Sequence, residues 1–183
     1  MPAESPGRHA LLVHPASDAG AVRTLEVELS RPSPGELQLA YTLTGDITQL
    51  RLPEPMPPVR ADGLWRHICF EAFIRRAGAA EYWEYNLSPS GAWAAYHFSG
   101  YREGMAPLLK GAPPQISFEA AAESVTLAAR IDIGWLARAG TALELALAAV
   151  IDDKAHVLSY WALVHPSGKP DFHHAESFVV PLD

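Results

Sequence analysis

Two alternating runs of residues, separated by a short turn, are the feature that most constrains the fold of this chain. In Tyr82–Leu87 every second residue is large and apolar, and the remaining positions include Glu84 and Asn86. A period of two places successive side chains on opposite faces of a strand. Ser88–Gly91 supplies the turn residues Ser-Pro-Ser-Gly, and an aromatic run, Trp93–Phe98, follows. The pattern predicts a β-hairpin that is unusually rich in aromatic side chains.

Period-two alternation recurs along most of the chain, between turns rich in Pro and Gly. The other apolar segments of this kind are 10–13, 25–29, 37–43, 116–118, 125–133, 143–151, 157–164 and 178–182. Roughly nine to eleven strands in one domain predict an all-β, antiparallel β-sandwich, with a closed barrel as the alternative. We expect at most one or two short helical turns, one of them within 134–140. The single domain spans 1–183, with 1–9 as a loose lead-in and 10–13 as an edge strand.

Composition restricts the class of protein and of ligand. Hydrophobic residues make up 49% of the 183 residues, which is sufficient for a sizeable core. The net charge of −7 argues against nucleic-acid or anionic-membrane partners, because these require basic patches. The single cysteine, Cys69, cannot form an internal disulfide, and the apolar segment near the N-terminus is too short for a signal peptide. We therefore expect a cytoplasmic protein, bacterial from its Ala, Arg and Pro content; the sequence does not indicate an oligomeric state.

Glu71 lies in a segment in which both parities are apolar, as in a central strand covered on both faces. A buried carboxylate needs a partner or a ligand. The nearby candidates are Arg66, Arg75 and Arg76. We predict that Glu71 is ionised and paired with one of these arginines, with a ligand contact as the alternative.

Three segments resemble the DOMON-like superfamily, which includes the family-nine-type carbohydrate-binding modules. They are 64–73, with Leu-Trp and Cys-Phe-Glu-Ala-Phe, 82–91, with Tyr-Trp-Glu-Tyr-Asn-Leu-Ser-Pro-Ser-Gly, and 160–173, with Tyr-Trp-Ala-Leu, His-Pro and Asp-Phe-His. More narrowly, the chain resembles the MurB-like DOMON group of small bacterial proteins, from about residue 22 onward. The resemblance implies a ligand-binding sandwich whose relatives hold sugars or haem. A Gly-rich phosphate loop for a flavin or nicotinamide is absent from the sequence.

The aromatic hairpin offers one candidate ligand site. Sugars present apolar C–H faces that stack on indole rings, while amides and carboxylates bind their hydroxyl groups. On this basis Trp83, Tyr85, Asn86 and Trp93 are predicted ligand contacts. The alternative is that these aromatic residues form part of the core.

The loop 165–174 offers a second group of candidates, because its prolines hold polar side chains at little entropic cost. Asp171 and His173 share a face of an extended segment, and Lys169 lies beside them. We predict that these three border the ligand cleft. A purely structural loop and a metal site with His165 as third ligand are the alternatives.

These patterns predict a non-catalytic protein that binds a carbohydrate or another small polar ligand, without a metal or cofactor. Trp65, Glu71 and Trp161 are assigned structural roles. A haem module is one alternative, since Met56, Met105 and several histidines are available, although no Cys-x-x-Cys-His motif is present. A hydrolase is the other alternative, although no nucleophile elbow surrounds a serine and the spacing of the carboxylates cannot be obtained from sequence.

Overall fold

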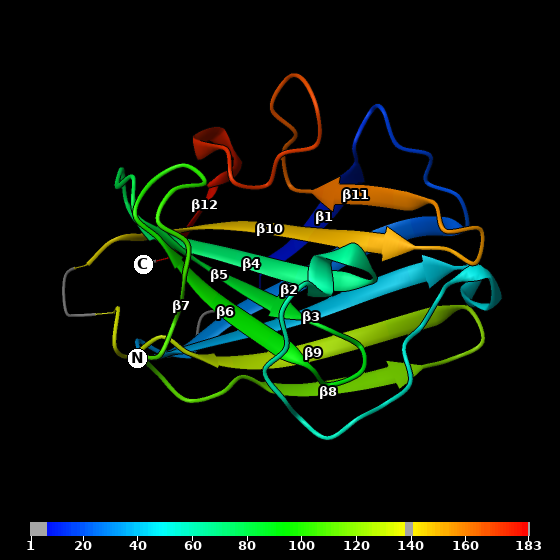
Figure 1. Ribbon diagram of the computed structural model, residues 1–183, viewed down its shortest axis with the longest axis horizontal. Coiled ribbons are helices and arrows are strands. Elements are labelled where there is room, and N and C mark those ends of the chain that lie inside the picture. Colours follow the sequence, from blue (N-terminus) through cyan, green and yellow to red (C-terminus); the bar gives the residue numbers. More distant parts are fainter. Residues whose placement is uncertain (1–6, 138–140, 183) are drawn as a thin grey trace.

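The computed structural model describes residues 7–137 and 141–182, which form antiparallel strands with three short 3-10 turns between them (Figure 1). The strands are β1 (Gly7–Val13), β2 (Val22–Ser33), β3 (Glu36–Gly45), β4 (Cys69–Arg76), β5 (Tyr82–Leu87), β6 (Trp93–Phe98), β7 (Ala106–Pro107), β8 (Gln115–Ala120), β9 (Ser124–Asp132), β10 (Leu143–Asp152), β11 (Leu158–Ala162) and β12 (Val180–Leu182). The 3-10 turns are η1 (Ile47–Gln49), η2 (Leu64–Arg66) and η3 (Ala175–Ser177). No helix in these ranges is long and apolar enough to cross a membrane.

The strands form one continuous curled sheet in the order β7-β6-β5-β4-β10-β11-β1-β2-β3-β9-β8, with β12 also paired to β10. β1 connects the two halves, because Leu12 and Val13 pair with β11 while Gly7–Leu11 pair with β2. The all-β, antiparallel architecture with few helical turns is thus confirmed. In place of the two separate sheets of a sandwich, a single sheet curls until its halves face each other, one behind the other in Figure 1.

The main hydrophobic core fills the inside of this curl. Apolar side chains from β2, β3 and β9 meet those from β4, β5 and β10. At the centre, the ring of Tyr41 lies 5.1 Å from that of Phe70, and its hydroxyl donates to the carbonyl oxygen of Glu71 at 2.8 Å. One buried polar group from each half is therefore satisfied across the core.

A second apolar cluster covers the outer face of β6, β5, β4 and β10. It contains Phe73, Tyr82 and Phe98 from the strands, with Phe172 and Phe178 from the segment between β11 and β12. Because this segment packs on the outer face, every residue of β4 from Cys69 to Ile74 is buried. The predicted burial of this strand on both faces is confirmed.

Four features differ from the sequence-based expectation. Residues 7–9 belong to β1, since they pair with Val27–Leu29 in register, and 1–6 lie outside the described residues. β1 lies inside the sheet rather than at its edge, because β11, which is distant in the sequence, pairs with it on the side away from β2. Of the helical turn expected within 134–140, the described residues show two hydrogen bonds, from the backbone N–H groups of Leu136 and Ala137 to the carbonyl oxygen of Ile133. Gly140 lies outside the described residues. The described part has three 3-10 turns rather than one or two.

The inner face of β5 contributes Trp83 to the core, where only 5% of the residue is exposed. Its ring makes an edge contact with Trp135 at 5.1 Å, and the Arg76 guanidinium lies over it at 5.3 Å. We predict that Trp83→Ala lowers the free energy of unfolding by about 3–5 kcal/mol, because it leaves a large cavity. Urea denaturation measures this loss.

Leu109→Ala is the control, since Leu109 is 85% exposed. It is expected to change the free energy of unfolding by less than about 0.5 kcal/mol. A Trp83→Ala protein as stable as this control would contradict the placement of Trp83 in the core.

Candidate functional site

A cavity of about 350 Å³ lies on the outer face of the half of the sheet that contains β4, β5, β6, β10 and β11. It lies between these strands and the segments that cross them. Its walls are largely aromatic and come from η2, β6, β11 and the segment after β11. The aromatic lining residues are Trp65, Phe98, Tyr160 and Phe172. The indole of Trp65 is 36% exposed, so a stacking surface is accessible beside the cavity.

Two carboxyl groups lie among these apolar walls, from adjacent strands. Glu71 on β4 pairs with Asn86, and Glu84 on β5 pairs with Phe73. The two acids are therefore diagonal neighbours on one face of the sheet. Both line the cavity and both are buried, Glu71 with 3% of its surface exposed. The cavity thus combines aromatic surfaces with a closely spaced acidic pair.

Burial and mutual repulsion keep this pair from being fully ionised. Loss of solvation raises the pKa of Glu71 well above its usual value, and the charge of Glu84 raises it further. Burial also raises the pKa of Glu84 to about 7, although Asn86 and Arg102 oppose the rise. Burial therefore favours the protonated form of Glu71, while the pKa of Glu84 lies at about 7.

The predicted ion pair between Glu71 and an arginine is wrong. Arg75 binds Glu144, its partner across the ladder, at 2.7 Å, and Arg76 binds Glu81 at 3.0 Å. Within the described residues Glu71 forms no ion pair, and its Oε1 atom is buried without a hydrogen-bond partner. Each nearby arginine on β4 has a carboxylate of its own, so Glu71 is stabilised by remaining protonated.

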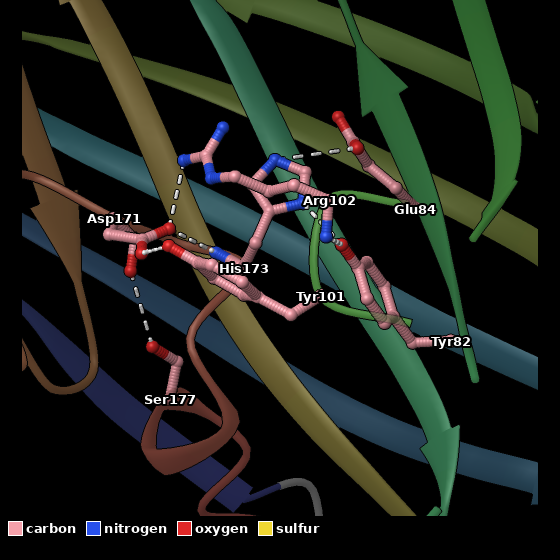
Figure 2. A network of polar contacts seen from close by, with 7 residues as sticks. All are labelled: Tyr82, Glu84, Tyr101, Arg102, Asp171, His173 and Ser177. Carbon is pink, nitrogen blue, oxygen red and sulfur yellow. Dashed lines mark hydrogen bonds and ion pairs between the residues drawn. The ribbon is translucent and has the colours of Figure 1, made fainter. Parts of the chain in front are cut away.

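Asp171 is the centre of a polar clamp that includes Tyr101, Arg102 and His173 (Figure 2). Asp171 accepts from the Arg102 guanidinium at 2.8 Å and from the Tyr101 hydroxyl at 2.5 Å. The backbone N–H of His173 donates to the same carboxylate at 3.1 Å. Arg102 has a left-handed backbone, with φ of 55°. The clamp therefore joins the loop after β6 to the segment after β11.

His173 lies between the clamp and the acidic pair, with its ring against Phe73 and Phe98. Its Nδ1 lies 2.7 Å from the Tyr82 hydroxyl, which also accepts from the backbone N–H of Arg102. Burial and the charge of Arg102 lower the pKa of His173 to about 4. The ring is neutral near pH 7, and its nitrogen nearest to the acidic pair is Nε2. That atom lies 3.9 Å from a Glu84 oxygen.

The structure corrects the placement of the predicted aromatic contacts. Trp83, Tyr85 and Trp93 belong to the inner core rather than to the cavity. The guanidinium of Arg60 covers Trp93 at 4.4 Å from the ring. Asn86 lies on the same strand face as Glu84 but is fully buried. The hairpin therefore borders the cavity with its outer face, which carries Glu84, and not with the face that carries Trp83 and Tyr85.

The three candidates from the loop 165–174 have different positions relative to the cavity. His173 lines the cavity, Asp171 supports it through the clamp, and Lys169 is exposed and contributes nothing to the lining. Of the residues assigned structural roles, Trp161 is buried in the core, whereas Trp65 and Glu71 line the cavity.

Sequence reasoning missed Glu84, Arg102 and the aromatic walls as site residues. One signal could have found Glu84: a carboxylate at a buried position of an aromatic strand requires the same explanation as Glu71. Arg102 gives no such signal, because its contact with Asp171 joins positions 69 residues apart.

Haem and metal ligation were tested against the same residues. Met105 and His173 both line the cavity, but Nε2 of His173 faces Glu84 and two carboxyl groups would lie against the macrocycle. These residues do not fit haem. In 7–137 and 141–182, no three His, Cys, Asp or Glu side chains are grouped to hold a metal ion.

The raised pKa values of the carboxyl groups make stability depend on pH. An acid whose pKa is raised on folding stabilises the fold at low pH, and this stabilisation is lost as pH rises above the unfolded value. We predict that Glu71→Gln matches the wild type at about pH 5 and is more stable at about pH 8, because glutamine imitates the protonated acid. Urea denaturation at both pH values provides the measurement.

The matched control is Glu119→Gln, since Glu119 lies exposed on β8. It is expected to leave the pH profile unchanged. A Glu71→Gln protein that is less stable than the wild type at the higher pH would show that Glu71 is ionised and stabilised by its surroundings.

Comparison with known proteins identifies the fold. No protein-family model and no curated protein matches the sequence. A crystal structure from Bacteroides uniformis ATCC 8492, of a protein provisionally assigned as carbohydrate-binding, is similar with a TM-score of 0.64. The likeness covers 94% of this chain and 84% of the other, at 15% sequence identity. The two proteins share a fold.

Proposed function

We propose that this chain is a non-catalytic binding protein for a carbohydrate or a similar small polar ligand, and that the ligand occupies the outer-face cavity. The observation that carries the proposal is the combination of an accessible indole with buried hydrogen-bonding groups in one cavity. Sugars require both, since their C–H faces stack on aromatic rings and their hydroxyl groups need polar partners.

The dimensions of the cavity favour a small ligand. About 350 Å³ is near the lower end of the range for small-molecule sites, so one or two sugar rings are the expected size. Trp65 provides the stacking surface, and Glu71, Glu84 and His173 provide donors and acceptors in the same cavity. The provisional carbohydrate assignment of the Bacteroides protein agrees with this ligand class.

The wider assignment belongs to the same proposal. The chain is a DOMON-like all-β domain of the MurB-like group that functions in a bacterial cytoplasm, without nucleic-acid or membrane partners. Its support is the three resembling segments, the shared fold and the net charge of −7.

Trp65→Ala tests the binding site, because this residue lies at the edge of the cavity and not in the core. We expect sugar affinity to fall by roughly ten-fold or more, since one stacked aromatic ring contributes about 1 kcal/mol or more beyond the area it buries. A glycan array identifies the ligand, and titration calorimetry measures the change.

Leu109→Ala and Trp83→Ala are the controls. The first removes an exposed apolar side chain outside the cavity, and the second removes a core indole, so it should reduce stability with no selective loss of affinity. Wild-type affinity in the Trp65→Ala protein, or no sugar bound by the wild type, would contradict the proposed site.

Acid–base catalysis is a second candidate, favoured by one observation. Two neighbouring carboxyl groups whose pKa values are raised unequally resemble the acid and base of a hydrolase. Our proposal predicts no turnover of nitrophenyl glycosides or esters. Turnover with an optimum near the pKa of Glu84, abolished in Glu84→Gln and retained in Glu119→Gln, would instead establish an enzyme.

A further inference from the structure

In the part of the chain that the structure describes, neither acid of the pair forms an ion pair with an arginine or lysine. Arg102 is the one positively charged side chain among the described residues that line the cavity; its charge lowers the pKa of both acids, but its guanidinium is bound by Asp171 at 2.8 Å. His173 is neutral near pH 7 and lies 3.9 Å from Glu84. The Oε1 atom of Glu71, buried and without a hydrogen-bond partner, belongs to a side chain that lines the cavity. Buried acids in this state provide a site for a ligand that brings its own positive charge.

The remaining titratable groups around the pair add no positive charge. Burial raises the pKa of Cys69, on the same strand as Glu71, so its thiol remains protonated. Tyr82 beside Glu84 is neutral, since burial raises its pKa to about 12. The hydroxyl of Tyr96, from β6, donates to Asp62 at 2.6 Å.

We propose that the cavity selects a ligand carrying a protonated primary amine, specifically an amino sugar with a free amino group, and binds the ammonium between Glu71 and Glu84. The proposal rests on the proposed function, since it names the class of sugar. It follows from the position of the two carboxyl groups and from the unpartnered Oε1 atom.

An ammonium group satisfies this site better than a hydroxyl group does. It supplies three donors and a full positive charge, so it can bond both carboxyl groups and cancel their repulsion. The aromatic walls also favour a cation, because its charge is attracted to the faces of the rings. The overall charge of −7 attracts cationic ligands toward the protein.

Proton balance gives the proposal a second signature. The ammonium retains its proton, while the carboxyl groups beside it become easier to ionise. A proton therefore leaves the protein for solvent on binding, and no covalent bond forms or breaks. Neutral sugars lack this effect because they leave the charge of the site unchanged.

Titration calorimetry with three matched probes tests the proposal. Glucosamine, glucose and N-acetylglucosamine differ at one ring position, which carries an ammonium, a hydroxyl or a neutral amide. At about pH 6.5 we expect glucosamine to bind at least ten-fold more tightly than either neutral sugar. Repeating the titration in two buffers of different ionisation heat measures the released protons.

Glu71→Gln and Glu84→Gln, tested separately, should each reduce the preference for glucosamine to less than about three-fold, because each keeps the shape of the acid but cannot ionise beside the ammonium. Glu119→Gln, a matched change on the exposed edge strand, should retain the full preference. Thermal unfolding confirms that every variant is folded before it is titrated.

The outcomes separate this inference from the proposed function. Equal affinity for glucosamine and glucose, with both lost in Trp65→Ala, overturns the amine inference and leaves carbohydrate binding intact. Binding of cyclohexylamine but not cyclohexanol, with no sugar bound, overturns carbohydrate binding and retains the amine site. Binding of calcium or zinc alone that depends on Glu71, with no amine preference, overturns the inference in favour of a metal site. No binding of any probe overturns both.

Discussion

The burial of β4 on both faces is the constraint on which the rest of this structure depends. On the inner face its apolar residues pack against β3, and Tyr41 binds the carbonyl oxygen of Glu71. On the outer face the segment after β11 shields Glu71 from solvent. A carboxyl group in this position must be paired or protonated, and the arginines of β4 already bind other carboxylates. The chemistry of the cavity therefore follows from the covering of one strand.

The sequence predicted the strands well because alternation is a local signal. It could not predict the face of the hairpin that borders the cavity. Both faces of Tyr82–Leu87 are buried, so period two separates Trp83 from Glu84 without showing which of them faces the core. The aromatic rings suggested a platform, but their large apolar area favours the interior, and the acid was left on the cavity side.

Long-range pairing was the other limit of prediction. β1 pairs with β11, some 150 positions away, and this pairing converts two expected sheets into one curled sheet. The sequence predicted that Asp171 borders the ligand cleft, whereas the structure places it in the clamp, and its partners Tyr101 and Arg102 lie in a different loop. Polar residues in a proline-rich loop indicate that contacts will form, whereas the identity of the partners depends on the tertiary fold.

The cavity retains groups that a purely structural interior would not. Glu84 contributes stability below its unfolded pKa, and this contribution is lost as pH rises from the unfolded pKa of 4.5 to about 7. His173 has the opposite sign, because its lowered pKa makes stability fall as pH drops from 6.5 to about 4. Where these two pH ranges overlap, the two effects on stability oppose each other. The acidic pair therefore has the larger effect on stability only at pH values above the unfolded pKa of histidine. An apolar residue at position 71 or 84 would remove the loss of stability that accompanies ionisation of a buried acid. Residues that are not the most stable choice for their position are typical of binding sites.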